Sequence, residues 1–195
     1  MHVTDLHRRS VEAFLDRLAP LAGPPADRWA SATPCPGWDV RALVNHVVVE
    51  DLWTVPLMGG ATLEEVGDRF EGDVLGDDPL GTARAAAEAA VTAAASGVVA
   101  GRTVHLSFGD APAEEYACQL AADHLVHGWD VAVATGGDPG ADAELVEELA
   151  AWFADREAAY RGAGVIGDRP PGSGDGDPWH ELLRAFGRRP GWPTP

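Results

Sequence analysis

Apolar residues recur at helical spacing in five segments, and this periodicity constrains the fold more than any other feature. The first segment shows it clearly, because Val11, Phe14 and Leu18 would lie on one face of a helix. Proline and glycine separate the segments, since proline cannot continue a helix and Gly-rich stretches favour turns. Five helices are therefore predicted, over residues 5–21, 39–58, 79–95, 112–135 and 142–161.

Residues at the ends of these segments support the assignment. Thr4 and Asp39 are expected to be the N-caps of the first two helices, because their side chains can accept a backbone N–H. Gly97 is expected to close the third helix, as glycine often does. Pro112 suits the first turn of the fourth helix, where its missing N–H is not needed. Residues 59–78 show no clear pattern.

The other segments are less regular. Residues 103–108 alternate weakly, which predicts a short strand or an extended connection. Residues 162–177 are rich in Gly, Pro and Asp, and residues 178–186 predict one short helix. We therefore expect a single all-α domain, with a helical bundle over residues 1–161 and a loop-rich extension over residues 162–195.

The composition indicates a globular protein with a strong negative charge. Hydrophobic residues make up 46% of the 195 residues, which is enough for one good-sized core. The net charge of −17 argues against a nucleic-acid partner, because phosphate binding needs clustered Lys and Arg. No apolar run reaches the roughly 18 residues of a membrane span, and the N-terminus lacks the layout of a signal peptide. Two cysteines are too few for a disulfide framework, so a cytoplasmic location is expected.

Two of the predicted helices carry potential metal ligands. Asp123 and His127 lie four residues apart, so both side chains leave the same face of one helix. His46 lies on a second helix and would complete a site of two histidines and one carboxylate. Three protein ligands leave a coordination position open, as in catalytic metal sites. Each residue also has an ordinary interpretation, because a lone histidine is commonly structural and Asp–His pairs also form surface hydrogen bonds.

Neighbouring polar residues are candidates for supporting roles. Asp130 continues the stripe of Asp123 and His127, and could accept a hydrogen bond from the second ring nitrogen of a ligand histidine. Glu50 follows His46 by four residues, and could be a fourth ligand, a proton acceptor or a solvated carboxylate. Glu50 and Asp130 are thus the predicted catalytic residues. His124 is a weaker alternative to Asp123 as a ligand, since it lies about 100° around the helix.

The remaining Cys, Trp and His residues are interpreted as structural. Cys35 is assigned a packing role in a Pro-rich turn, and Cys118 is taken as a small core residue. The tryptophans are expected to fill the core, namely Trp29, Trp38, Trp53, Trp129 and Trp152. Among them, Trp129 could also border the metal pocket. The histidines without a partner at ligand spacing are expected on the surface: His2, His7, His105 and His180.

Three motifs resemble the DinB-like superfamily of mycothiol-dependent maleylpyruvate isomerases. They are TPCPGWDVRALVNH at residues 33–46, DHLVHGWDVAVATG at residues 123–136 and LLRAFGRRPGW at residues 182–192. The third resembles one actinobacterial branch, whose members are mostly uncharacterised. The resemblance implies a four-helix up-down-down-up bundle with a divalent metal, zinc or nickel, at one end of its core. By motif position, the ligands of the family fall on His46, Asp123 and His127.

The resemblance also implies chemistry with a thiol cofactor. Mycothiol or bacillithiol would bind at the metal and attack an electrophilic small molecule in a transfer, conjugation or isomerisation. The isomerase itself has Glu at the position of Asp123 and a separate C-terminal domain, for which this chain is too short, so isomerisation of maleylpyruvate is not expected. The alternatives are a thiol-independent metal-dependent hydrolase or cyclase, and a non-catalytic metal-binding bundle. A homodimer is a further expectation.

Overall fold

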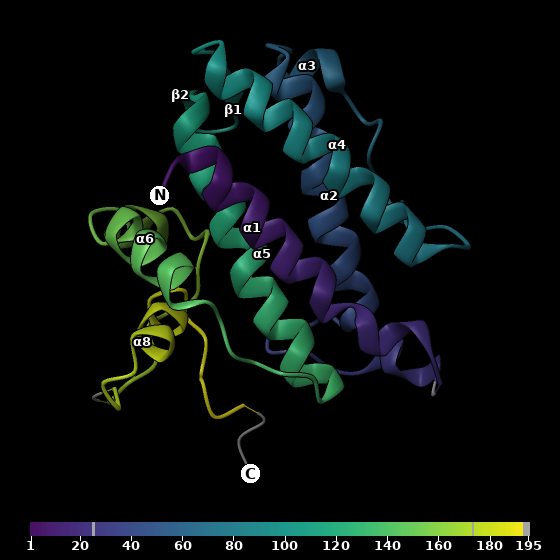
Figure 1. The fold of residues 1–195 in the computed structure, drawn as a ribbon, viewed down its shortest axis with the longest axis vertical. Helices are drawn as coiled ribbons and strands as arrows, with labels where there is room; N and C mark the ends of the chain where they lie inside the picture. Colours follow the sequence, from purple (N-terminus) through teal and green to yellow (C-terminus); the bar gives the residue numbers. More distant parts are fainter. Residues whose placement is uncertain (25, 173, 193–195) are drawn as a thin grey trace.

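The computed structural model describes residues 1–24, 26–172 and 174–192, and most of them are helical (Figure 1). The α-helices span Val3–Arg17 (α1), Val40–Met58 (α2), Leu63–Val66 (α3), Pro79–Val99 (α4), Ala113–Thr135 (α5), Ala143–Phe153 (α6), Glu157–Gly162 (α7) and Pro178–Ala185 (α8). Two short 3-10 helices, Ala19–Ala22 (η1) and Ala26–Ala30 (η2), follow α1. An antiparallel hairpin of Thr103–Leu106 (β1) and Gly109–Pro112 (β2) precedes α5.

The hairpin corrects the prediction of an all-α fold. Residues 103–106 form β1, residues 107–108 form a turn, and residues 109–112 form a second strand that the periodicity did not predict. Val104 lies opposite Ala111 in the register, and both side chains are buried. Val104 packs with Leu57 near the end of α2 and with Tyr116 near the start of α5, so the hairpin covers these helix ends.

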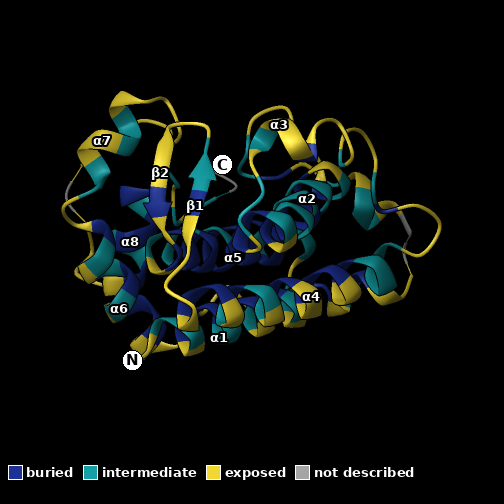
Figure 2. Ribbon diagram, turned by 90° about the horizontal axis from the view of Figure 1, so that it is seen from above, coloured by how far each residue is buried: buried dark blue, intermediate teal, exposed yellow. Residues whose placement is uncertain are grey.

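The long helices pack lengthwise in pairs. α1 packs against α5, and α2 packs against α4, while further contacts join α1 to α4 and α2 to α5. The α5 helix is enclosed over most of its length, as its dark blue colour in Figure 2 shows. Polar side chains on α5 therefore lie out of water and need partners within the protein. No helix in the described residues combines the length and apolarity that crossing a membrane requires.

The C-terminal segment packs onto α5 through α6 and α8. These two helices contact each other, and α6 also contacts α1 and α5. The rings of Phe153 on α6 and Phe186 just after α8 stack with their centroids 4.0 Å apart. The residues that follow α8 are thereby held beside α5, close to the polar stripe predicted on that helix.

Two predicted helices differ at their ends from the structure. α1 begins one residue before Thr4, because His2 is the N-cap and its Nδ1 accepts the N–H of Thr4. The helix predicted over residues 142–161 is divided into α6 and α7. At the break, Arg156 Nη1 donates to the carbonyl of Trp152 at 2.5 Å, and the backbone N–H of Arg156 bonds to Phe153 instead. The side chain thus takes the acceptor that a continuous helix would use.

Gly97 does not close the third helix as predicted. It lies inside α4, which continues to Val99, and a Cβ atom at this position would come within 2.8 Å of the Met58 sulfur on α2. The glycine therefore permits the close approach of α4 to the end of α2. A packing requirement, and not helix termination, explains this residue.

His7 is buried, so the prediction that it lies on the surface is wrong. Its side chain is 1% exposed, and its ring meets the ring of His124 edge-on at 5.8 Å. The Nε2 atom of His7 has no hydrogen-bond partner. Burial, and then the neighbouring charge of His124, lower the pKa of His7 to about 3. The imidazole is therefore a neutral part of the core.

Candidate metal centre

Three polar side chains form a stripe along one face of α5. Asp123, His127 and Asp130 follow one another at four and three residues, which are the spacings of neighbours on a helix face. Asp130 is fully buried and His127 is 7% exposed, whereas the side chain of Asp123 keeps 30% exposure. The stripe predicted from the sequence is thus present, and it opens toward solvent at Asp123.

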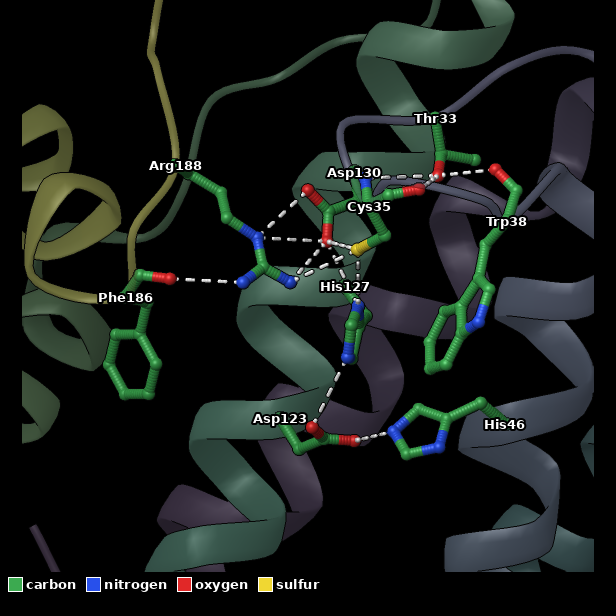
Figure 3. Close-up of polar contacts among 9 residues, drawn as sticks. All are labelled: Thr33, Cys35, Trp38, His46, Asp123, His127, Asp130, Phe186 and Arg188. Carbon is green, nitrogen blue, oxygen red and sulfur yellow. Dashed lines mark hydrogen bonds and ion pairs between the residues drawn. The ribbon is translucent and has the colours of Figure 1, made fainter. Parts of the chain in front are cut away.

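His46 on α2 faces this stripe. Its Nε2 lies 3.7 Å from Oδ2 of Asp123, and Oδ1 of the same carboxylate lies 3.3 Å from Nε2 of His127. Figure 3 shows the carboxylate of Asp123 between the two imidazole rings, whose centroids are 5.2 Å apart. The structure therefore brings together the three residues that were predicted as metal ligands.

The arrangement of these three side chains fits a divalent ion. One potential ligand atom from each residue lies within 4.8 Å of the others. A tetrahedral site with bonds of about 2.0–2.1 Å needs its ligand atoms about 3.3 Å apart, and the two carboxylate oxygens of Asp123 lie 3.7 Å and 3.3 Å from the nitrogens of His46 and His127. The Oδ2 atom of Asp123 is buried without a hydrogen-bond partner, which is costly for a carboxylate and is relieved by a cation. Two imidazoles and one carboxylate suit zinc or nickel.

Asp123 and the histidines beside it shift one another's pKa values. Burial raises the pKa of Asp123, but the neighbouring imidazoles of His127 and then His46 outweigh it and hold the pKa well below its usual range. Burial lowers the pKa of His127, but Asp123 and Asp130 outweigh it and hold that pKa well above its usual range. In the absence of metal, the site is therefore a buried ion pair, and a metal ion would replace the proton of His127.

The other ring nitrogen of His127 belongs to a second polar cluster. Its Nδ1 lies 2.9 Å from Oδ2 of Asp130, and since a carboxylate only accepts, Nδ1 is the donor. The Cys35 thiol lies 3.3 Å from the same oxygen, and Arg188 Nη2 reaches it at 2.9 Å. Burial raises the pKa of Asp130, but His127 and Arg188 outweigh it and lower that pKa. Asp130 is thus a charged acceptor with three donors.

Trp38 borders the site, whereas Trp129, which was expected in the core and could also have bordered the site, does not. The ring of Trp38 lies 4.9 Å from the ring of His46 and 6.2 Å from that of His127, and the residue is 37% exposed. Trp129 instead packs into the apolar cluster of α5, α6 and α8 and is 3% exposed. The prediction that Trp38 fills the core is therefore wrong, because the turn before α2 places its ring over the two histidines.

Glu50 and His124 occupy different surroundings. Glu50 is half-buried on α2, and burial followed by the charge of Asp123 raises its pKa. His124 is fully buried and faces away from the candidate ligands, with its Nδ1 2.8 Å from the Leu120 carbonyl and its Nε2 3.2 Å from Asp51. The alternative in which His124 replaces Asp123 as a ligand finds no support in this geometry.

Sequence reasoning missed two members of the second cluster. Cys35 was assigned to packing, yet its sulfur contacts Asp130 and also lies 4.0 Å from Nδ1 of His127. Arg188 was not selected at all, although it belongs to the third motif, LLRAFGRRPGW. The signals were present in both cases, because each residue lies inside a quoted motif. Neither has a neighbour at ligand spacing, so periodicity could not reveal them.

Comparison with known proteins agrees with the motifs. Residues 7–132 match the family described as the mycothiol maleylpyruvate isomerase N-terminal domain. The chain belongs to this family. It is also similar to two uncharacterised proteins of Mycobacterium tuberculosis, one from each of two strains, with 33% identity over 190 residues. That similarity covers 93% of this chain and 95% of each relative. No solved structure gives a significant match.

The limits of the family match divide the site. His46, Asp123, His127 and Asp130 all fall within residues 7–132. Arg188 lies outside this range, in the part of the chain that follows the family match. The candidate ligands thus lie within the family domain, and Arg188 after it contacts Asp130, the neighbour of His127.

Proposed function

We propose that this protein is a divalent-metal enzyme that uses a low-molecular-weight thiol, mycothiol, to attack an electrophilic small molecule. The reaction would be a transfer, a conjugation or an isomerisation. The observation that carries the proposal is the convergence of His46, Asp123 and His127 in a member of the mycothiol maleylpyruvate isomerase N-terminal domain family. Three protein ligands leave room for one exogenous ligand at zinc or nickel, and a thiol suits either ion.

Each residue around the site has a proposed role. His46, Asp123 and His127 would hold the ion, and the ion would lower the pKa of a thiol bound to it. Glu50 is the proposed proton acceptor, because it follows the candidate ligand His46 by one turn of α2 and its carboxyl group is half-buried beside the site. Trp38 offers an apolar face to the substrate beside the two histidines.

The setting of this activity is also a proposal. The family arrangement would be a four-helix up-down-down-up bundle made of α1, α2, α4 and α5, and the lengthwise packing of these helices supports it. We place the reaction in the cytoplasm, with a small molecule as substrate and no role for nucleic acid or a membrane. We further propose a homodimer, which analytical ultracentrifugation would test.

A thermal-shift experiment tests the thiol. With zinc present, mycothiol at about 100 times its Kd should add about 2.7 kcal/mol of stability. For a chain of this size the melting temperature should then rise by about 5–10 °C above that with zinc alone. Without zinc, mycothiol should leave the melting temperature unchanged, because the thiol would bind through the metal.

S-methyl mycothiol is the matched control ligand, since it keeps the molecule but blocks the sulfur. A shift with zinc that the thiol does not increase would contradict the thiol chemistry and favour a metal-dependent hydrolase or cyclase. An equal shift with the S-methyl compound would show that the thiol group is not recognised. The absence of any shift with zinc or nickel would contradict the metal itself.

A further inference from the structure

The guanidinium of Arg188 is engaged in contacts inside the protein, and the side chain keeps 16% exposure. It comes from the segment after α8, yet its guanidinium lies against Asp130 on α5, 58 residues earlier. Nε lies 3.2 Å from Oδ1 and Nη2 lies 2.9 Å from Oδ2 of Asp130. Nη1 donates to the Phe186 carbonyl at 3.0 Å, and Nη2 also reaches the Cys35 sulfur at 3.3 Å. Every nitrogen therefore has a protein partner.

Asp130 connects this guanidinium to the candidate metal centre. Its Oδ2 accepts from Arg188 on one side and from Nδ1 of His127 on the other, at 2.9 Å in both cases. Figure 3 shows the three side chains in a row, with the far nitrogen of His127 directed at Asp123. A ligand histidine binds a metal through one nitrogen, and the hydrogen bond of the other nitrogen fixes the ring. Arg188 thus affects the orientation of the His127 nitrogen that faces Asp123, through its contact with Asp130.

The second cluster also resembles a ligand set. Cys35, His127 and Asp130 each offer one atom, and these atoms lie within 4.8 Å of one another. The guanidinium of Arg188 contacts both Cys35 and Asp130, so it takes the position of a cation in this cluster. Arginine keeps its charge and offers a planar fork that matches a carboxylate, which a lysine could not reproduce.

Two neighbours fix the position of Arg188. The ring of Phe186 is stacked on Phe153, as described above. Gly187 has a φ of +79°, and a Cβ atom there would lie 2.9 Å from the backbone oxygen of Gly167. Only glycine fits at this turn without strain. The chain is therefore held at the two residues that precede Arg188, whose side chain reaches Asp130.

From this geometry we infer that Arg188 is a positioning residue for the metal centre: it holds Asp130, and Asp130 holds the His127 ring with Nε2 directed at the ion. The inference rests on the proposed function, because it assumes that His46, Asp123 and His127 bind a metal. It extends that function to the C-terminal segment, which lies outside the family match.

The test compares Arg188→Met with Arg184→Met. Arg184 is a matched control from the same segment, because its guanidinium bonds to the carbonyl of Pro170 and not to Asp130. Zinc affinity is measured by competition with a chromophoric chelator, and the visible spectrum of the Co²⁺-loaded protein reports the ligand geometry. Arg188→Met should bind zinc about 10–100-fold more weakly, as loss of a partner behind a metal ligand does, and should change the Co²⁺ spectrum. Arg184→Met should match the native chain in both measurements.

Two further measurements separate positioning from stability. In the double variant with Asp130→Asn, the losses of zinc affinity should not add, because both substitutions break the same connection to His127. In metal-free protein, the Nδ1 proton of His127 should give a downfield NMR resonance in the native chain and in Arg184→Met. This resonance should be absent in Arg188→Met.

The outcomes distinguish this inference from the proposed function. If the native chain binds neither zinc nor nickel, the proposed function fails, and the NMR comparison still decides whether Arg188 positions the ring. If the native chain binds zinc and Arg188→Met retains its affinity, spectrum and downfield resonance, the positioning role is wrong. Additive losses in the double variant would also overturn it.

Discussion

Replacement of His127 by Ala should nearly abolish metal binding. The residue is one of the three predicted ligands that the structure brings together, and it is paired with both Asp123 and Asp130. Loss of a partner behind a ligand weakens metal binding about 10–100-fold, so loss of a ligand itself should exceed about a hundredfold. Inductively coupled plasma mass spectrometry after reconstitution with Zn²⁺ or Ni²⁺ and gel filtration should find close to one equivalent in the native chain and almost none in the variant.

His105→Ala is the control for this experiment. His105 lies on β1, is paired with Asp110 at 2.7 Å and is far from the candidate ligands in the chain. It should retain the full metal content of the native protein. Circular dichroism should confirm that His127→Ala remains helical, so that loss of metal is not loss of fold. A folded His127→Ala chain with unchanged metal content would show that the ion, if bound, is held elsewhere.

The second large effect should be a loss of stability in mild acid that depends on His7. Burial and the nearby His124 charge lower the pKa of His7 to about 3 in the folded protein, compared with 6.5 for an exposed histidine. Between these two values the unfolded chain binds a proton that the folded chain does not. The contribution of His7 to the free energy of unfolding is therefore fully present above about pH 6.5 and is lost as the pH decreases toward 3. At pH 5 the loss from this residue should be about 2 kcal/mol.

Urea unfolding at pH 7.5 and pH 5 checks this prediction. His7→Leu removes the titrating group and also the unpaired Nε2, and His7→Gln removes only the titration. Both variants should lose about 2 kcal/mol less than the native chain between the two pH values. Only His7→Leu should keep or exceed the native stability at pH 7.5, because it leaves no unpaired polar atom at this buried position. If both variants retain the native pH dependence, His7 is not the group responsible.

The helices could be predicted because their signals are local. α2 follows its N-cap Asp39 over residues 40–58, and α5 begins next to Pro112 and covers nearly the predicted range. The hairpin was harder to predict, since it depends on a buried pair, Val104 and Ala111, whose burial comes from distant helices. The break between α6 and α7 depends on a single side chain, Arg156, that competes for a helix carbonyl.

The candidate site was predictable to the extent that it lies on one helix face. Asp123, His127 and Asp130 share a stripe because of their spacing, and their relation to one another follows from helix geometry. The contacts of Arg188 and Trp38 depend on how separate segments dock, and no spacing in the sequence encodes that. Periodicity does indicate the burial of one further residue.

That residue is His7. It lies four residues before Val11 and seven before Phe14, so it shares the apolar face of α1. The histidine was interpreted as a surface residue because it lacked a partner at ligand spacing, although position on the helix face was the better guide. Its partner in the core, His124, lies 117 residues further along the chain, at a distance that periodicity does not address.

The contact between Arg188 and Cys35 has a consequence for the order of assembly during synthesis. It joins residues 153 positions apart, whereas the three candidate ligands all lie within residues 46–127. Chains fold progressively as they leave the ribosome, and contacts that span a long stretch of sequence form late. The nascent protein can therefore gather its ligands before Arg188 has been translated. A metal ion captured at that stage would meet a loosely oriented His127, and maturation of the centre would end only when the C-terminal segment docks.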